Sequence, residues 1–124
     1  DTMTGSTGDD TYIIAAADTG DTWATADVIT DLATTSDKIN LAGAAADNDN
    51  YTEANGATLE TESAVVTAAF IALNGIITYY AVYNVAGTGN GYVYYDADGI
   101  DGSQDVVSLS NLSTANKIIL GDIV

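Results

Sequence analysis

The sequence has 124 residues, which is enough for one domain with a single hydrophobic core and too few for two. Its 18 acidic residues outnumber its two basic ones, and the formal net charge is −16 at pH 7. Such a surface repels phosphate backbones, and no apolar run is long enough to cross a bilayer, so we expect neither nucleic-acid binding nor membrane insertion. The chain has no Cys and no His, so it lacks a thiol nucleophile and the commonest general base, and we expect no catalytic centre.

The acidity has to be reconciled with a folded core. Hydrophobic residues make up 47% of the chain and eight residues are tyrosine, which indicates a packed protein rather than a disordered one. Carboxylates that repel one another destabilise a compact state unless cations neutralise them. Hard divalent ions take oxygen ligands, so we expect the protein to bind Ca²⁺.

The first 17 residues have a nine-residue period. Residues 1–3 and 10–12 are Asp-Thr-Met and Asp-Thr-Tyr, and a Gly-rich stretch, 5–9, lies between them. A parallel β-roll has this pattern, because each repeat makes one tight turn and one short strand with an inward apolar residue. The repeat does not recur, so residues 1–17 are predicted to be the last turns of such a roll.

The middle of the chain predicts short strands, a loop and a helix. Residues 27–32 and 38–41 are apolar runs on either side of a polar turn, and they predict two short strands. Residues 43–58 are mainly Ala, Asp, Asn and Gly, and they predict a surface loop. Residues 60–73 have acidic residues at the start and small apolar residues on one face, which predicts a helix that ends at Asn74-Gly75.

The last third of the chain is predicted to form β-sheet. Large side chains alternate along residues 77–85, and apolar runs at 92–95 and 106–109 follow turns at 87–91 and 96–105. An alternative is that the tyrosines form a sugar-stacking platform, but aromatic residues at such positions are more often core or cross-strand pairs. The side chains expected to share one core are Tyr79, Tyr83, Val107 and Leu109.

The N-terminal repeat resembles the haemolysin-type calcium-binding repeats of the RTX (repeats-in-toxin) proteins. Their consensus is Gly-Gly-x-Gly-x-Asp-x-apolar-x. Gly5, Gly8, Asp10 and Tyr12 match it, and Ser6 replaces the second glycine.

The segments that follow are similar to the C-terminal domains of serralysin-type proteins. Residues 27–32 and 37–41 match the Asp-x-Ile-x-Asp and Asp-Lys-Ile elements that come after the repeats, in the same order. Residues 94–99 and 120–124 resemble the final hairpin and the end of those domains. Residues 43–75 have no counterpart in that pattern.

The resemblance implies a set of calcium ligands. In the family, turn carbonyls and Asp carboxylates bind Ca²⁺ between stacked turns; glycine allows the carbonyls to converge and the carboxylate supplies hard oxygen. The alternative for each position is structural, as a Gly-rich turn or as a solvated carboxylate beside a strand. The metal-site residues implied are Gly5, Gly8, Asp10, Asp27 and Asp31.

We therefore expect a mainly β fold: the end of a parallel β-roll (1–17) that continues into an antiparallel β-sandwich with one covering helix (18–124), as a single compact unit. The resemblance implies a non-catalytic, calcium-stabilised C-terminal cap and secretion module of a longer extracellular protein exported by a type I system. The whole protein would be a surface structural protein, such as an S-layer protein or an adhesin. Its expected partners are calcium ions, the type I secretion machinery, and other copies or neighbouring domains. Alternatives are the tail of a secreted protease, lipase or epimerase, and a carbohydrate-binding module.

Overall fold

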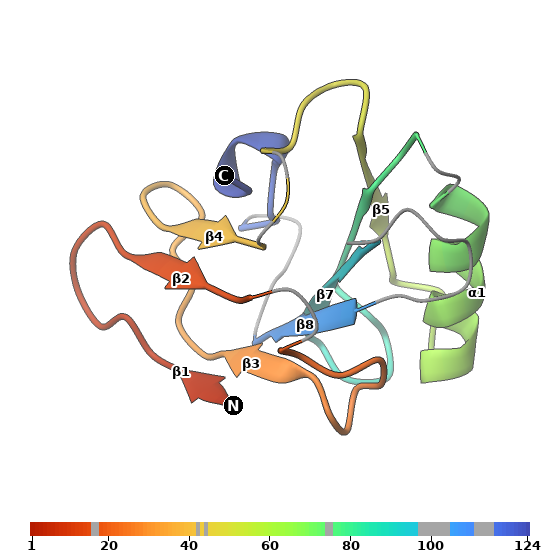
Figure 1. Cartoon of the computed structure of the whole chain (residues 1–124). Coiled ribbons are helices and arrows are strands. Elements are labelled where there is room, and N and C mark those ends of the chain that lie inside the picture. Colours follow the sequence, from red (N-terminus) through yellow and green to blue (C-terminus); the bar gives the residue numbers. More distant parts are fainter. Residues whose placement is uncertain (16–17, 42, 44, 74–75, 97–104, 111–115) are drawn as a thin grey trace.

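A computed structural model describes the chain except for residues 16–17, 42, 44, 74–75, 97–104 and 111–115 (Figure 1). The described part is mainly β. The predicted helix stop at Asn74-Gly75 and most of the predicted turn 96–105 lie outside it. The elements in chain order are β1 (Thr2–Met3), β2 (Thr11–Ile13), β3 (Asp27–Ile29), β4 (Lys38–Asn40), β5 (Tyr51–Asn55), α1 (Glu62–Ala72), β6 (Tyr79–Tyr83), β7 (Gly91–Tyr95), β8 (Asp105–Leu109) and the 3-10 turn η1 (Leu120–Asp122).

Six of the strands form one mixed sheet in the order β1-β3-β8-β7-β6-β5, and β2 and β4 form a second, parallel pair. Strands β6, β7 and β8 are antiparallel neighbours, as their alternation and turns predict. The sheet as a whole is not antiparallel, however, because β3 joins β8 and β5 joins β6 in parallel. Helix α1 crosses from β5 to β6, and such a crossover returns the chain in the same direction.

The polar stretch 43–58, predicted to be a loop, contains strand β5. It pairs along its whole length with β6, from Tyr51 opposite Tyr79 to Asn55 opposite Tyr83. As the last strand of its sheet, β5 is only half-buried over most of its length, so its polar side chains stay in contact with solvent. Hydrophobic alternation therefore does not reveal it.

The sheet separates two groups of apolar side chains. One face packs against β2 and β4, and the other is covered by α1, so the molecule has three layers (Figure 1). The predicted core is confirmed on the first face: Tyr79, Val107 and Leu109 are buried there, and Tyr83 packs against them. The side chains under the helix include Val65, Ala69, Leu73, Tyr80, Val82, Tyr92, Tyr94 and Val106.

The helix-covered part of the molecule has no charges along a long stretch of sequence. Residues 63–95, which include most of α1 and all of β6 and β7, contain no Asp, Glu, Lys or Arg. Apolar burial is therefore the main stabilising term on this side of the sheet. No helix in the described ranges is long and apolar enough to cross a membrane.

Helix α1 begins at Glu62, close to the predicted start at residue 60, and the side chain of Thr61 caps it. Thr61 has extended backbone angles, and its hydroxyl accepts a hydrogen bond from the N–H of Ala64 at 3.3 Å. The first turn also contains Glu62, whose charge is favourable at a helix N-terminus.

Replacing the cap should weaken the fold. We expect Thr61→Ala to lower the free energy of unfolding by about 1 kcal/mol, because the N–H of Ala64 loses its side-chain acceptor and keeps only its bond to the Thr61 carbonyl. Thr67→Ala is the matched control: Thr67 is an exposed threonine in the same helix that bonds only the carbonyl of Ser63, and alanine has the higher helix propensity. Urea unfolding of both variants measures the difference. Equal stability of the two variants would contradict the cap assignment.

Candidate functional site

The turn between β1 and β2, residues 4–10, contains most of the predicted calcium ligands. Its backbone is held by a carboxylate that follows β3: the N–H of Gly5 donates to Oδ1 of Asp31 at 3.0 Å, and the N–H of Ser6 donates to Oδ2 at 2.8 Å. The hydroxyl of Tyr12 donates to the same Oδ1 at 2.9 Å. These donors hold the pKa of Asp31 below its ordinary value of 3.8.

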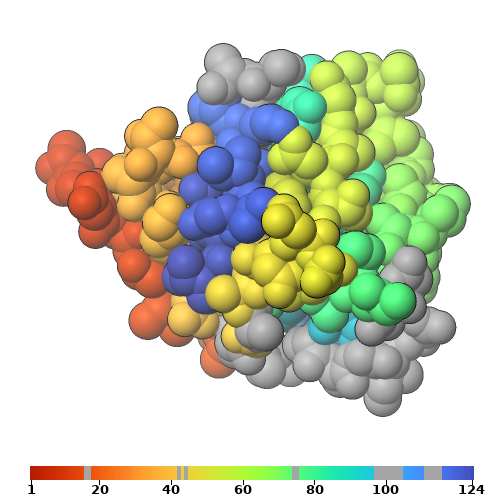
Figure 2. Space-filling view, turned by 90° about the horizontal axis from the view of Figure 1, so that it is seen from above, coloured from red at the N-terminus to blue at the C-terminus, as the bar shows by residue number. Residues whose placement is uncertain are grey.

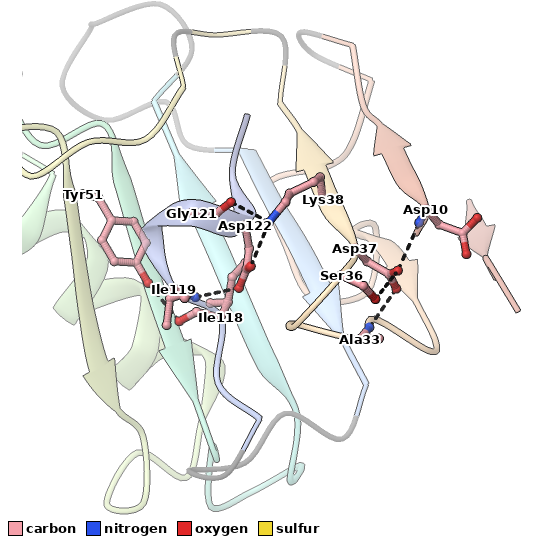
Figure 3. A network of polar contacts seen from close by, with 10 residues as sticks. All are labelled: Asp10, Ala33, Ser36, Asp37, Lys38, Tyr51, Ile118, Ile119, Gly121 and Asp122. Atoms are coloured by element: carbon pink, nitrogen blue, oxygen red, sulfur yellow. Dashed lines mark hydrogen bonds and ion pairs between the residues drawn. The ribbon is translucent and has the colours of Figure 1, made fainter. Parts of the chain in front are cut away.

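A second carboxylate repeats this arrangement beside β2. Asp37, buried at the end of the turn before β4, accepts the N–H of Asp10 at 3.1 Å. It also accepts the N–H of Ala33 at 2.8 Å and the hydroxyl of Ser36 at 3.3 Å (Figure 3). Asp31 and Asp37 each bond backbone that lies 25 to 27 residues earlier in the chain. Asp31 and Asp37 thus join the part of the chain that contains β3 and β4 to the part that contains β1 and β2. We call these two side chains the interlayer carboxylates.

Close contacts and positive φ angles restrict which residues the first turn can contain. A Cβ atom at Gly5 would lie 2.4 Å from Oδ2 of Asp10 and 2.7 Å from the Tyr12 hydroxyl, so only glycine fits there. Gly8 has a φ of 133°, which side chains disfavour. Ser6, which replaces a consensus glycine, keeps a left-handed φ of 74°, so the turn has the backbone form for which glycine is preferred.

The structure brings together some of the predicted ligands and separates others. Asp10 and Asp31 both lie against Gly5, and Gly8 is in the same turn. Asp27 is at the start of β3, buried, with its carboxylate against the amino group of Asp1. Among the described residues, no three acidic side chains converge closely enough to hold a metal ion.

The sequence pattern does not predict the polar role of Tyr12. The nine-residue period marks it as an inward apolar position, and it is buried as predicted. Its hydroxyl, however, also accepts the N–H of Gly5 at 3.1 Å while donating to Asp31. Burial, the bond to Asp31 and the nearby negative charges raise the pKa of Tyr12 to about 12, so it stays a neutral donor. The polar end of an aromatic residue in a carboxylate-rich turn is the signal that could have found it.

The outer side of this turn is open. A cavity of about 430 Å³ is lined by residues 3–5 and 10–13, which belong to the edge strands β1 and β2 and to the turn between them. Ile13, at the end of β2, is 72% exposed. The turn forms one projecting side of the molecule (red in Figure 2).

The opposite side of β4 is closed by the C-terminal residues. Ile123 bridges Ile39 in parallel, and the N–H of Val124 donates to the Ile39 carbonyl at 2.9 Å. In Figure 2 the final segment (blue) fills the space between the orange and yellow parts of the chain. The buried side chain of Ile123 therefore belongs to the core that faces β2 and β4.

A buried carboxylate fixes the C-terminal turn. Asp122, 1% exposed, accepts the N–H of Ile119 at 2.9 Å and lies 3.6 Å from the Lys38 ammonium, which also donates to the Gly121 carbonyl at 2.8 Å (Figure 3). The Tyr51 hydroxyl donates to the Ile118 carbonyl at 3.1 Å. Burial raises the pKa of Asp122 above 3.8 despite these partners.

Most tyrosines of β6 and β7 have no exposed aromatic surface: Tyr79, Tyr80, Tyr92 and Tyr94 are buried. Tyr83, at the end of β6, is half-buried, and the Lys117 ammonium lies 5.6 Å from the centre of its ring. Trp23 is used structurally: its ring stacks on Tyr92 with the centroids 4.4 Å apart, and its indole N–H donates to the Tyr94 hydroxyl at 2.8 Å. A sugar-stacking platform needs several exposed rings side by side, and of the tyrosines in these strands all but Tyr83 are buried.

Comparison of the sequence with protein-family models and with curated proteins finds no match. The functional argument therefore depends on the residues of the chain itself.

Removing the charge of Asp31 should change how stability depends on pH. Because its pKa in the folded state is depressed, Asp31 stabilises the fold above pH 3.8, and this contribution is lost as the pH falls through the lower folded value. We expect Asp31→Asn to be less stable than the parent near neutral pH and to lose less stability on acidification. Asp122 has a raised pKa, so its contribution has the opposite slope and changes above pH 3.8.

Denaturant midpoints between about pH 6 and pH 2 measure this difference. The matched control is Asp9→Asn, which removes an exposed carboxylate from the same turn and none of the bonds described for it. If Asp9→Asn and Asp31→Asn have the same pH profile, the assigned role of Asp31 is wrong.

Proposed function

We propose that this chain is a non-catalytic, calcium-stabilised C-terminal cap and secretion module of an extracellular protein exported by a type I system. The observation that carries the proposal is the course of the first four strands. The chain alternates between the two sheets, with β1 and β3 in one and β2 and β4 in the other, and both pairs are parallel. We take these strands to be the last turns of a parallel β-roll.

The asymmetry of the two ends supports a capping role. On one side, β3 is covered by β8, and β4 is covered by the C-terminal residues. On the other side, β1 and β2 are the edges of their sheets, with the cavity beside them. Open strand edges accept further strands. A preceding layer of the same β-roll fits this side, while the closed side ends the stack.

Calcium dependence is supported by charge. The chain carries −16, and Asp10 and Asp31 both lie against the first turn. An ion that binds the folded state alone shifts folding by mass action. In the cytoplasm, where free calcium is scarce, the chain would stay loose enough for export; outside the cell, calcium would fold it.

For the whole protein we propose a surface structural protein, such as an S-layer protein or an adhesin, because the chain is rich in Ala, Thr, Gly and Asp and has no Cys and few Lys.

Calcium should raise the melting temperature. At 100 to 1,000 times the Kd, linkage contributes roughly 2 to 4 kcal/mol, which for a domain of this size corresponds to about 5 °C or more. Melts monitored by circular dichroism in excess EDTA, in millimolar Ca²⁺ and in Mg²⁺ at the same ionic strength measure the shift. The Mg²⁺ arm controls for charge screening. Identical melts in EDTA and Ca²⁺ would refute calcium stabilisation.

The secretion role can be separated from the structural role of the same residues. We expect deletion of residues 113–124 to abolish export by a type I exporter of RTX proteins. The control is Ile123→Ala, which should lower stability by about 2 to 5 kcal/mol because it removes a buried side chain, but should still be exported, since the exporter receives the unfolded chain. Export and cytoplasmic retention are measured by immunoblot of the medium and the cells.

Normal export of the deletion variant would show that the C-terminal residues are structural only. Loss of export in both variants would show that folding, rather than recognition, limits secretion.

A further inference from the structure

Three polar side chains meet at one end of the main sheet. Asp27 begins β3 and Asp105 begins the parallel strand β8, in the register that places Asp27 opposite Val107. Tyr95 ends the antiparallel strand β7 and lies directly opposite Asp105. Strands β3, β8 and β7 are consecutive in the sheet. Asp27, Asp105 and Tyr95 therefore lie near one another at the same end of these strands.

The three side chains also share a face. Side chains alternate along a strand, so Asp27 lies on the face of Ile29 and Asp105 on the face of Val107. Ile29, Val107 and Tyr95 all belong to the core that packs against β2 and β4. The two carboxylates and the phenol therefore border the same buried layer. Asp27 is 6% exposed and Tyr95 is 1% exposed.

A turn tied to this end of the sheet brings a third carboxylate. The hydroxyl of Thr19 donates to the Val106 carbonyl at 2.7 Å and accepts the N–H of Asp27 at 2.8 Å. Its neighbour Asp18 is exposed and is held beside the strand ends by these bonds. We call Asp18, Asp27, Asp105 and Tyr95 the strand-end cluster.

The strand-end cluster contains three carboxylates and, among the described residues, one polar group without a partner. The Tyr95 hydroxyl is buried and has no hydrogen-bond partner within the described part of the chain, which is costly for a polar group. Burial, followed by the charges of Asp105, Asp27 and Asp18, raises its pKa. The side chains of Lys38 and Lys117 pair elsewhere, with Asp122 and Glu53. The cation found at Asp27 is the amino group of Asp1.

We propose that the strand-end cluster binds a divalent cation of the calcium type. Asp27 and Asp105 would supply carboxylate oxygens from the sheet. Asp18 would rotate toward them from its turn, since no three acidic side chains converge in the described structure. The Tyr95 hydroxyl would donate to one of the ligating oxygens. Oxygen ligands of this kind suit Ca²⁺, which accepts irregular coordination.

This inference deepens the proposed calcium dependence and changes its location. In the first turn, both oxygens of Asp31 already accept N–H groups and a phenol hydroxyl, which leaves less of the carboxylate for an ion. In the strand-end cluster, by contrast, the buried Tyr95 hydroxyl lacks a partner among the described residues, and it lies beside one buried carboxylate, Asp27, and two less buried ones. A cation there would draw the carboxylates together and bring an acceptor oxygen to the Tyr95 hydroxyl.

Calcium titration of variants tests the site. Calcium affinity is measured by isothermal titration calorimetry, and Tb³⁺ luminescence sensitised by tyrosine reports whether the ion is close to an aromatic ring. We expect Asp27→Asn/Asp105→Asn to bind Ca²⁺ at least tenfold more weakly than the parent. Asp9→Asn is the matched control and should bind like the parent.

Two further variants keep the test decisive. If the double variant does not fold, Asp18→Asn changes only an exposed side chain and should still weaken binding. Tyr95→Phe should melt no lower than the parent in EDTA and gain less from calcium. Parent-like affinity in Asp27→Asn/Asp105→Asn or Asp18→Asn would overturn the site.

The outcomes also separate this proposal from the preceding one. If calcium stabilisation is lost in Asp10→Asn/Asp31→Asn and kept in Asp27→Asn/Asp105→Asn, the strand-end site is wrong and the calcium-stabilised cap stands. If the parent itself binds no Ca²⁺, both calcium proposals are wrong.

Discussion

The bonds from backbone N–H groups to Asp31 and Asp37 are the constraint on which the N-terminal part of the structure depends. Strands β1 and β2 have only two and three residues, so their ladders supply few backbone hydrogen bonds. The interlayer carboxylates add charge-assisted bonds at the turns, where the backbone would otherwise lack partners. Glycine at position 5 has a separate cause, because a Cβ atom there would meet the Asp10 carboxylate and the Tyr12 hydroxyl.

The rest of the molecule is stabilised differently. Apolar burial on both faces of β6, β7 and β8 dominates there, and most of this region is free of charge. The two parts meet where β3 pairs with β8. The acidic N-terminal segment therefore contributes two strands, β1 and β3, to the sheet whose centre is uncharged. A cation bound at this junction, as proposed for the strand-end cluster, would link the stability of the N-terminal strands to that of the uncharged centre of the sheet.

Sequence reasoning found the elements whose signals are local. Helix α1 has acidic residues at its start and apolar residues on one face, and β6 to β8 have alternation and turns, so their positions were predicted closely. The parallel pairing of Asp27 with Val107 joins residues far apart in the chain, and no local pattern encodes it. Strand β5 was missed because its exposed edge tolerates polar side chains.

The candidate site was predicted in part for the same reason. The glycines and Asp10 follow from a nine-residue period, which is a local signal. The hydrogen bonds of Asp31 and the meeting of Asp27 with Asp105 and Tyr95 arise from strand stacking and register. These become visible only when the chain is folded. The sequence grouped Asp27 with Asp31, but the structure places them at opposite ends of β3 and its following turn, with different partners.

The shortness of β1 and β2 has a consequence for aggregation. Long, flat, apolar edge strands recruit other chains into fibrils, and proteins avoid this with short edges and charged side chains. Here the two open edges have only two and three residues, in a chain of net charge −16. The preceding layer that we propose would be held at high local concentration by the polypeptide and could dock on them. A separate chain in solution would have no such advantage and would meet electrostatic repulsion, so short edges and negative charge together would favour pairing within one polypeptide over polymerisation.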